Sequence, residues 1–292
     1  MLTLVIGKIG QQESEMEKTN PTIFHITHWK AGSQWIAEIL KNSAPERFVQ
    51  MEIADPHGMG GRGTLNFYVN PLKRGNIYGT VYLTREQFQS VVFDPIWRTK
   101  EPEAYYLRRA LGNWWNYGIR HSPCKSFIVI RDLRDTLVSL YFSTKYSHKL
   151  ITDQLAELRQ KLDSLDTENG LMYMLDEVLP SSVAIQTSWI GASDALILRY
   201  EDILGNEYAF FEKLIDYCEI NINRERLRDI VRYNIFEAAT GRKPGQEDVN
   251  AHLRKGIAGD WQNHFTDRIK IEFKQRYGEL MIKTGYEKDL NW

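Results

Sequence analysis

The sequence predicts an α/β fold, with three α/β/α layers built around a central, mainly parallel sheet. Short apolar runs alternate with amphipathic helical patterns along the chain, which is typical of strand–helix–strand units. The runs Lys125–Ile130 and Ala195–Tyr200 show no strict apolar–polar alternation, so they indicate strands buried on both faces. The length of 292 residues suits one large domain. We therefore expect a single domain over 21–292, preceded by a flexible leader over 1–20.

Apolar runs between loop signals predict the strands, and helical periodicity predicts the helices. The expected strands are Pro21–Thr27, Val49–Ile53, Asn76–Thr84, Lys125–Ile130 and Ala195–Tyr200. The first expected helix begins at Ile36. The other expected helices are Thr84–Val92, Glu103–Tyr117, Thr136–Phe142, Thr152–Asp163, Leu171–Val178, Pro180–Ile190, Ala209–Cys218, Arg224–Tyr233 and Thr266–Thr284. Thr84 and Gln87 have capping-box spacing, and Asn169-Gly170 predicts a break between two helices. The polar, aperiodic segment Thr240–Gly259 predicts a long loop.

Composition narrows the class of protein. A net charge of −1 with scattered basic residues argues against a protein that coats nucleic acid. The two cysteines, Cys124 and Cys218, have no CxxC partner, so neither a disulfide framework nor a cysteine metal site is expected. No run reaches the roughly 18 apolar residues of a membrane span. We expect a cytoplasmic protein without a metal cofactor.

The segment Thr27–Trp35 links the first predicted strand to the first helix through a short loop with a lysine and a glycine. Unpaired N–H groups at a helix N-terminus attract anions, and glycine lets the backbone approach them closely. Lys30 precedes Gly32, so this is not a Walker A loop. By itself the segment fits an anion cradle or an ordinary strand–helix turn equally well.

Two further segments are expected to bring cations close to Lys30. Ligands of parallel sheets bind at the carboxyl ends of the strands, which puts Lys30, Arg131 and Tyr200 on one rim. Ser139 follows Arg131 by eight residues, about two helical turns, so both can approach one phosphate. The loop Leu253–Trp261 adds two adjacent cations and two glycines. The three segments together predict a nucleotide site.

These motifs resemble the sulfotransferase family, which uses 3′-phosphoadenosine 5′-phosphosulfate (PAPS) and has a P-loop-like fold. The family's phosphosulfate loop reads roughly T-Y-P-K-S-G-T-T-W, and Thr27–Trp35 reads T-H-W-K-A-G-S-Q-W. Arg131 and Ser139 match its strand-closing arginine and following serine. Arg254–Thr266 matches its closing loop R-K-G-x-x-G-D-W-x-N-x-F-T, and Leu198–Asp202 matches L-x-Y-E-D.

The resemblance implies a role for each matched residue. Lys30 would stabilise the leaving phosphate during sulfuryl transfer, while Trp35, Tyr200 and Phe236 would contact the adenine. For Trp35 and Phe236, core packing is the alternative. The remaining implied ligands are Ala31, Gly32, Ser33 and Gln34 for the 5′-phosphate, and Arg131, Ser139, Arg254, Lys255 and Gly256 for the 3′-phosphate. Sulfuryl transfer by in-line displacement then needs positioning and fixed cations, with no metal.

The general base is the main departure from the family pattern. The K-x-H segment of the vertebrate cytosolic members is missing. In other branches the resemblance implies a glutamate after the lysine, and Glu52 stands there, with His57 close by. Glu52 is expected on a strand next to the first strand, within reach of Lys30. A surface ion pair or loop hydrogen bond is the alternative role for either candidate. His148 is a candidate for lining the acceptor pocket.

The predicted function is transfer of a sulfuryl group from PAPS to a hydroxyl or amine of a small-molecule, lipid or carbohydrate acceptor, with PAP as product. A small-molecule P-loop kinase and a non-catalytic PAP-binding relative stay open as alternatives. Segment 147–178 is a candidate lid. Oligomeric state stays open, because the family's K-x-x-x-T-V-x-x-x-E dimer motif is broken. The aligned residues are Gln262, Thr266, Asp267 and Ile271.

Overall fold

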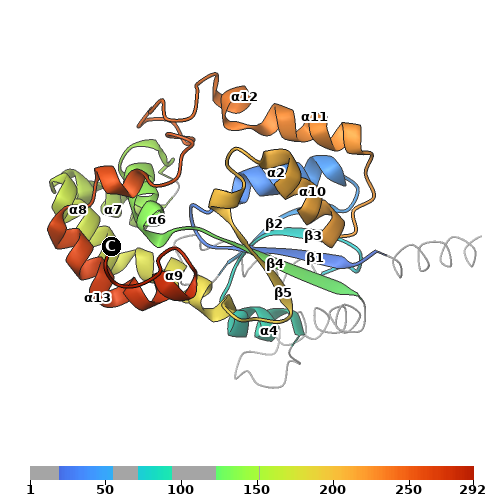
Figure 1. Ribbon diagram of the computed structural model, residues 1–292, viewed down its shortest axis with the longest axis horizontal. Helices are drawn as coiled ribbons and strands as arrows, with labels where there is room; N and C mark the ends of the chain where they lie inside the picture. The colour runs from blue at the N-terminus through green and yellow to red at the C-terminus, as the bar shows by residue number, and fades with distance from the viewer. Residues whose placement is uncertain (1–19, 55–71, 94–122, 151) are drawn as a thin grey trace, which may run out of the picture.

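A five-stranded sheet with all neighbouring strands parallel forms the centre of the computed structural model, which describes residues 20–54, 72–93, 123–150 and 152–292 (Figure 1). The strand order is β2-β3-β1-β4-β5. The strands are β1 (Thr22–Thr27), β2 (Phe48–Ala54), β3 (Ile77–Tyr82), β4 (Cys124–Ile130) and β5 (Ala195–Arg199). The α/β prediction with a parallel sheet is confirmed.

Successive side chains of the central strands pack into apolar clusters on opposite faces of the sheet, which explains the continuous apolar sequences of these strands. Phe127 and Val129 of β4 pack with the cluster on one face of the sheet. Ile128 and Ile130 pack with the cluster on the other face. Since β1 pairs with β4 over the full length from Thr22 to Thr27, these strands end at the same level. Their carboxyl ends therefore form one rim.

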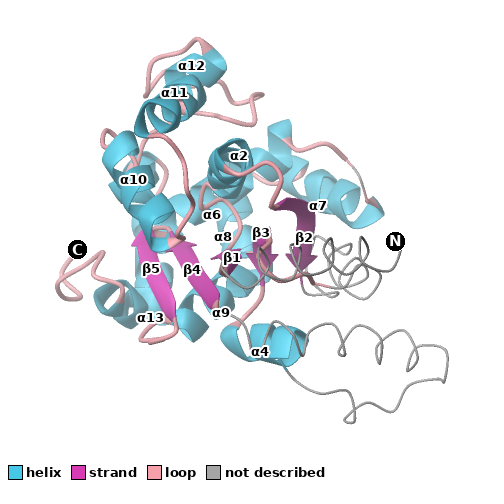
Figure 2. Cartoon of the chain, turned by 90° about the vertical axis from the view of Figure 1, so that its right-hand side faces the viewer, coloured by secondary structure: helices cyan, strands magenta, loops and turns pink. Residues whose placement is uncertain are grey.

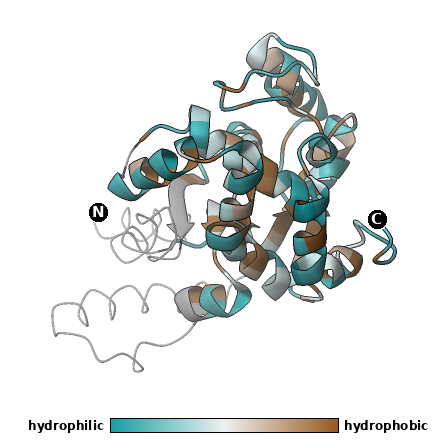
Figure 3. Cartoon of the chain, turned by 90° about the vertical axis from the view of Figure 1, so that its left-hand side faces the viewer, coloured by the Kyte–Doolittle hydropathy of each residue, from teal (hydrophilic) through white to brown (hydrophobic). Residues whose placement is uncertain are grey.

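Helices cover both faces and extend beyond the rim (Figures 1 and 2). Helices α2, α10 and α11 pack on the first face, and α4 and α9 on the second. Their bounds are α2 (Ser33–Ser43), α4 (Arg85–Phe93), α6 (Leu133–Phe142), α7 (Asp153–Asp163), α8 (Thr167–Glu177), α9 (Leu179–Trp189), α10 (Glu207–Tyr217), α11 (Arg224–Asn234), α12 (Phe236–Thr240) and α13 (Asp267–Lys283). In Figure 3 apolar colour gathers toward the interior.

A third apolar cluster lies where α6 continues from β4. Leu137 and Tyr141 of α6 pack there with α8, α9 and α13. Gly170 is inside α8, where an added Cβ would approach the Tyr141 ring to 2.6 Å. The predicted helix break at Asn169-Gly170 is therefore wrong. The break falls before Thr167, and the Asp166 side chain caps α8 by accepting from the Asn169 N–H.

Other local predictions have different outcomes. The capping box of α4 is confirmed, since the Thr84 N–H donates to Gln87 Oε1 and the Gln87 N–H to Thr84 Oγ1. The prediction that the strand of Glu52 lies next to the first strand is wrong, because β3 lies between β2 and β1. The predicted helix Glu103–Tyr117 and the leader 1–20, apart from residue 20, lie outside the described residues.

In the part of the chain that the structure describes, none of the helices is both long and apolar enough to cross a membrane. Cys124 and Cys218 are free thiols.

Two residues aligned with the family's dimer motif lie on or beside α13. Thr266 is the N-cap of α13, where its hydroxyl accepts from the Ile269 N–H. Ile271 lies on the surface of the same helix with 62% of its area exposed.

Candidate functional site

The loop between β1 and α2 has an unusual backbone. Lys30 and Gly32 both adopt left-handed conformations, with φ of 66° and 79°. Gly32 is the N-cap of α2, with no side-chain cap and no acidic residue in the first turn, so the positive end of the helix is uncompensated. A Cβ on Gly32 would come within 2.8 Å of the Tyr200 ring. Glycine is therefore required both by conformation and by close packing.

Two aromatic residues support this loop from the side. Trp29 stacks on Tyr82, with ring centroids 4.6 Å apart. The Tyr82 hydroxyl donates to Ser33 Oγ over 2.9 Å. The tryptophan that departs from the family's proline thus anchors the loop through its ring. Ala31 is fully buried and Gln34 is exposed.

Arg131, directly after β4, connects the Lys30 loop to β5. Its Nη1 donates to the Lys30 carbonyl over 2.8 Å, and its guanidinium lies 4.7 Å from the centre of the Tyr200 ring. The Arg131 N–H donates to His28 Nε2, and the other ring nitrogen of His28 is paired with the Trp29 carbonyl. Burial lowers the pKa of His28 to about 4, so this imidazole is a neutral support. The Arg131 Nε has no hydrogen-bond partner among the described residues, which leaves a donor for an anion.

The Lys30 amine points to α6 and the turn that follows it. Nζ donates to Ser143 Oγ over 3.1 Å. Burial, with the charges of Arg131 and Arg254, lowers the pKa of Lys30 to about 8. Ser143 begins a π-helical turn, Ser143–Ser147. Sequence reasoning missed Ser143, although it follows Ser139 by four residues and therefore lies on the same helix face.

The closing loop holds its cations around one buried carboxylate, Asp260. Arg254 pairs with Asp260 and also with Glu247. Lys255 Nζ lies 2.6 Å from Asp260 Oδ1, and His264 Nε2 lies 3.3 Å from Oδ2. Burial pulls the pKa of Asp260 upward, but hydrogen bonds from these side chains and Asn263 outweigh it and hold that pKa well below its usual range. Asp260 therefore stays charged and orders both cations.

A second carboxylate attaches the closing loop to α6. Asp135 accepts hydrogen bonds from the backbone N–H groups of Gly259 and Trp261, over 2.6 Å and 2.9 Å. From the other side, Arg242 donates to the carbonyls of Gln246 and Arg254. The predicted loop over 240–259 is confirmed, and these bonds make it a fixed structure.

The two aromatic residues that the resemblance assigns to adenine differ in their surroundings. Phe236 begins α12 and lies against the closing loop, where a Cβ on Gly256 would come within 2.6 Å of its ring. Trp35 packs edge-on against Phe211 at 5.6 Å, beside the core on the first sheet face. Phe236 therefore lies against the closing loop, while the packing of Trp35 agrees with the core alternative.

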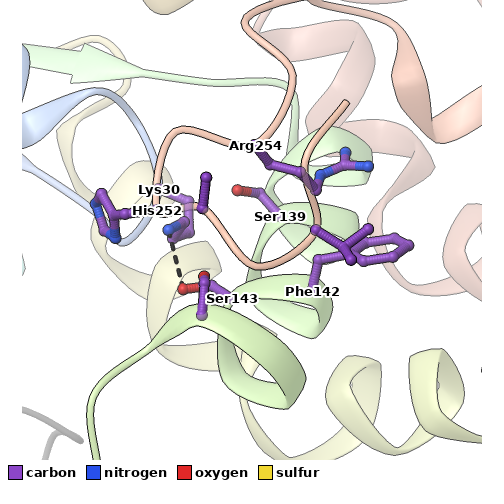
Figure 4. A pocket seen from close by; sticks show the side chains of 9 residues that line it. Lys30, Ser139, Phe142, Ser143, His252 and Arg254 are labelled. Atoms are coloured by element: carbon purple, nitrogen blue, oxygen red, sulfur yellow. Dashed lines mark hydrogen bonds between the residues drawn. The ribbon is translucent and has the colours of Figure 1, made fainter. Parts of the chain in front are cut away.

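A small pocket lies between these segments (Figure 4). Lys30, Ser139 and Arg254 line it, so it joins one residue from each predicted anion-binding segment. Ser143, Phe142 and His252 are lining residues that sequence reasoning did not single out. His252 had a local signal, since it precedes the Arg254-Lys255 pair by two residues.

The described part of the structure places the backbone of one of the two predicted bases. Glu52 lies on β2, two strands away from β1, which separates the two backbones by about 10 Å. His57 lies outside the described residues. His148 follows the π-helical turn, and its ring nitrogen Nδ1 is paired with the Lys149 carbonyl. Residues 20–54, 72–93, 123–150 and 152–292 hold no group of three His, Cys, Asp or Glu side chains placed to bind a metal.

Comparison with known proteins gives a consistent result. The chain is 26% identical over 174 residues to 3-alpha-hydroxysteroid sulfotransferase of Cavia porcellus, covering 56% of this chain and 58% of the relative. It is 26% identical over 187 residues to cytosolic sulfotransferase 3 of Arabidopsis thaliana, covering 57% and 58%. The chain thus spans little more than half the length of these relatives.

The structure of mouse sulfotransferase SULT7A1 complexed with PAP shares the fold. Its TM-score is 0.52 at 17% identity, covering 92% of this chain and 87% of that one. The family described as the sulfotransferase domain matches residues 116–285, more than half of the chain. This chain therefore belongs to the sulfotransferase domain family.

Proposed function

We propose that this protein transfers a sulfuryl group from PAPS to a hydroxyl or amine of a small-molecule, lipid or carbohydrate acceptor. One observation carries the proposal: Lys30, Ser139 and Arg254, from three distant segments, line one pocket, and Arg131 bonds the Lys30 carbonyl beside it. A nucleotide with phosphates at both ends of its ribose matches that distribution of charge. The mouse sulfotransferase of similar fold is complexed with PAP, which supports the same choice of donor.

Each cation has a part in the proposed reaction. Lys30, beside the uncompensated N-terminus of α2, takes the phosphosulfate and stabilises the charge that develops on the leaving oxygen. Ser33 and the backbone of Gly32 hold the 5′-phosphate. Arg131 offers its free Nε to the 3′-phosphate, together with Ser139 and the Arg254–Gly256 segment. Tyr200 and Phe236 border the base. Since these groups are fixed by packing, their main contribution is positioning.

The surroundings of the pocket support an acceptor that is partly apolar. Phe142 and Val249 line the pocket beside Ser143 and Ser147. A steroid-like or phenolic hydroxyl suits such a mixed lining. The steroid acceptor in the name of the guinea-pig relative agrees with this class. The name of the plant relative supports a cytosolic setting for this chain as well.

Calorimetric titration with PAP tests the donor site directly. We expect binding by the wild-type protein and a loss of about 100-fold in affinity in Lys30→Ala and in Arg131→Ala, since each removes charge-assisted contacts to phosphate. Lys41→Ala is the matched control, because Lys41 lies exposed on α2 and its ion pair is with the exposed Glu38 of the same helix. Absence of PAP binding, or equal binding in all four proteins, refutes the proposed function. A thermal shift by ATP–Mg alone would favour the kinase alternative.

A further inference from the structure

His252 stands in the pocket where the proposed reaction takes place. It shares the lining with Lys30 and Ser143, and it lies just before the closing loop, two residues ahead of Arg254 (Figure 4). Its side chain is exposed, whereas His25 on β1 and His28 directly after that strand are fully buried. An incoming acceptor can therefore reach the ring from solvent.

The ring of His252 has no assigned structural task. It makes no hydrogen bond or ion pair to any other residue in the described part of the chain, so both nitrogens are open to a ligand. His148 differs, since one of its ring nitrogens is already paired with a carbonyl, and His264 lies against Asp260. An imidazole without a partner at a cationic pocket has the chemistry of a proton acceptor.

The electrostatic surroundings keep this ring neutral. Although the ring reaches solvent, the protein packed around it lowers the pKa of His252 to about 4, and the charges of Lys30 and His148 act in the same direction. At neutral pH the ring therefore carries a free lone pair. When an anionic donor neutralises the charge of Lys30, the repulsion falls and the ring becomes a stronger base. Donor binding and base strength are thus coupled.

Resting on the proposed function, we propose that His252 is the general base of the transfer reaction. The acceptor oxygen forms a bond to sulfur as the bond from sulfur to the bridging phosphate oxygen breaks. The electron pair of the broken bond leaves with the phosphate, next to Lys30. The acceptor's hydroxyl proton moves to the open nitrogen of His252 and then to water, so no oxidant or metal takes part.

The first test separates binding from transfer. Wild type, His252→Gln and the exposed loop control Asn250→Ala are titrated with PAP and then assayed with labelled PAPS, with 2-naphthol and water as acceptors. We expect PAP affinity to stay within threefold in all three proteins. Transfer should fall about 100- to 10,000-fold in His252→Gln only, the range for a lost general base. With 4-nitrophenol, an acceptor that ionises by itself at neutral pH, the rate of transfer should fall far less in His252→Gln.

Each other outcome has a definite meaning. If wild type does not bind PAP, the proposed function itself fails. If it binds PAP but transfers to no acceptor, or if His252→Gln transfers normally, the assignment of the base is overturned. Loss of PAP affinity in His252→Gln would make the ring a donor ligand instead. Loss of transfer in Glu52→Gln or His57→Gln, with His252→Gln active, would identify Glu52 or His57 as the general base.

A titration of the histidine rings by NMR gives a readout that needs no turnover. The resonance that disappears in His252→Gln identifies the ring. We expect its pKa near 4 in the free protein and a higher pKa with saturating PAP. An ordinary pKa that PAP does not change would contradict the coupling of donor and base.

Discussion

The Lys30 loop and the closing loop both bring cations to the pocket, but they hold them differently. Lys30 donates to a neutral hydroxyl, Ser143, and its pKa is lowered to about 8. Arg254 and Lys255 both pair with the carboxylate of Asp260. Among the described residues Lys30 has no anionic partner, whereas Arg254 and Lys255 are already neutralised. The difference indicates that the Lys30 side supplies electrostatic attraction and the closing loop supplies a fixed geometry.

The largest expected effect follows from removing the unpaired cation. Lys30→Met should lower the rate of transfer from PAPS about 100- to 1,000-fold, because Lys30 supplies the full positive charge that faces the leaving oxygen in the proposed reaction. Lys30→Arg should retain part of the rate by keeping the charge. Lys41→Met provides the matched control on the exposed side of α2. A Lys30→Met protein with at least a third of the wild-type rate would show that the unpaired cation is not the main source of electrostatic stabilisation.

Asp260→Asn tests the role of the paired cations, Arg254 and Lys255. The substitution leaves Arg254 and Lys255 without their shared anion, so the closing loop should lose its geometry although its positive charge rises. We expect PAP affinity to fall about 10- to 100-fold, since hydrogen bonds to charged groups contribute about 1.5–3 kcal/mol. Asp267→Asn is the control, because that side chain is exposed on α13. Tighter PAP binding by Asp260→Asn would show that charge matters more than geometry here.

The pH dependence of PAP binding distinguishes the two sides. Lysine is charged below its pKa, so affinity should be constant from pH 6.5 to 7.5 and fall as pH rises through about 8. The fall should approach tenfold per pH unit, because binding then requires the uptake of about one proton. Lys30→Arg should abolish this dependence, since arginine stays charged. A flat profile in wild type would show that Lys30 has an ordinary pKa.

The smallest expected effect concerns the backbone of the Lys30 loop. Gly32→Ala and Gly191→Ala both place a side chain at φ of 79°. Only Gly32 has Tyr200 within 2.8 Å of the added Cβ, and Gly191 has nothing within 4 Å. Chemical denaturation should therefore show about 1–2 kcal/mol of destabilisation in Gly191→Ala and roughly 1 kcal/mol more in Gly32→Ala. Equal losses would mean that the Tyr200 ring moves aside freely.

The fold was predictable because its signals are local and strong. Both faces of β4 are buried, which requires the uninterrupted apolar run Phe127–Ile130 that the sequence displays. The order of the strands was less predictable, because a crossover can insert a strand such as β3 between two others without any local mark. Gly170 was misread for a similar reason, since its need to be small arises from Tyr141, a contact that spacing does not reveal.

The site was predictable where its residues follow one another on a single element. Arg131 and Ser139 are spaced by the helix itself, and the Lys30 loop lies between adjacent elements. Ser143 and His252 reach the same pocket from segments more than a hundred residues apart, so only tertiary packing brings them together. The Asp260 and Asp135 contacts belong to the same class, because a lone carboxylate in a loop predicts no particular partner.

A single calorimetric series with PAP, adenosine 5′-phosphate and ATP–Mg tests whether the three segments form one nucleotide site. If the three cationic segments form one site for a nucleotide with two separate phosphate ends, PAP should bind at least about 100-fold more tightly than adenosine 5′-phosphate, the value of one or two charge-assisted bonds to the 3′-phosphate. ATP–Mg should not exceed adenosine 5′-phosphate appreciably. Equal affinity for PAP and adenosine 5′-phosphate, or tightest binding of ATP–Mg, would show that the three segments do not form such a site.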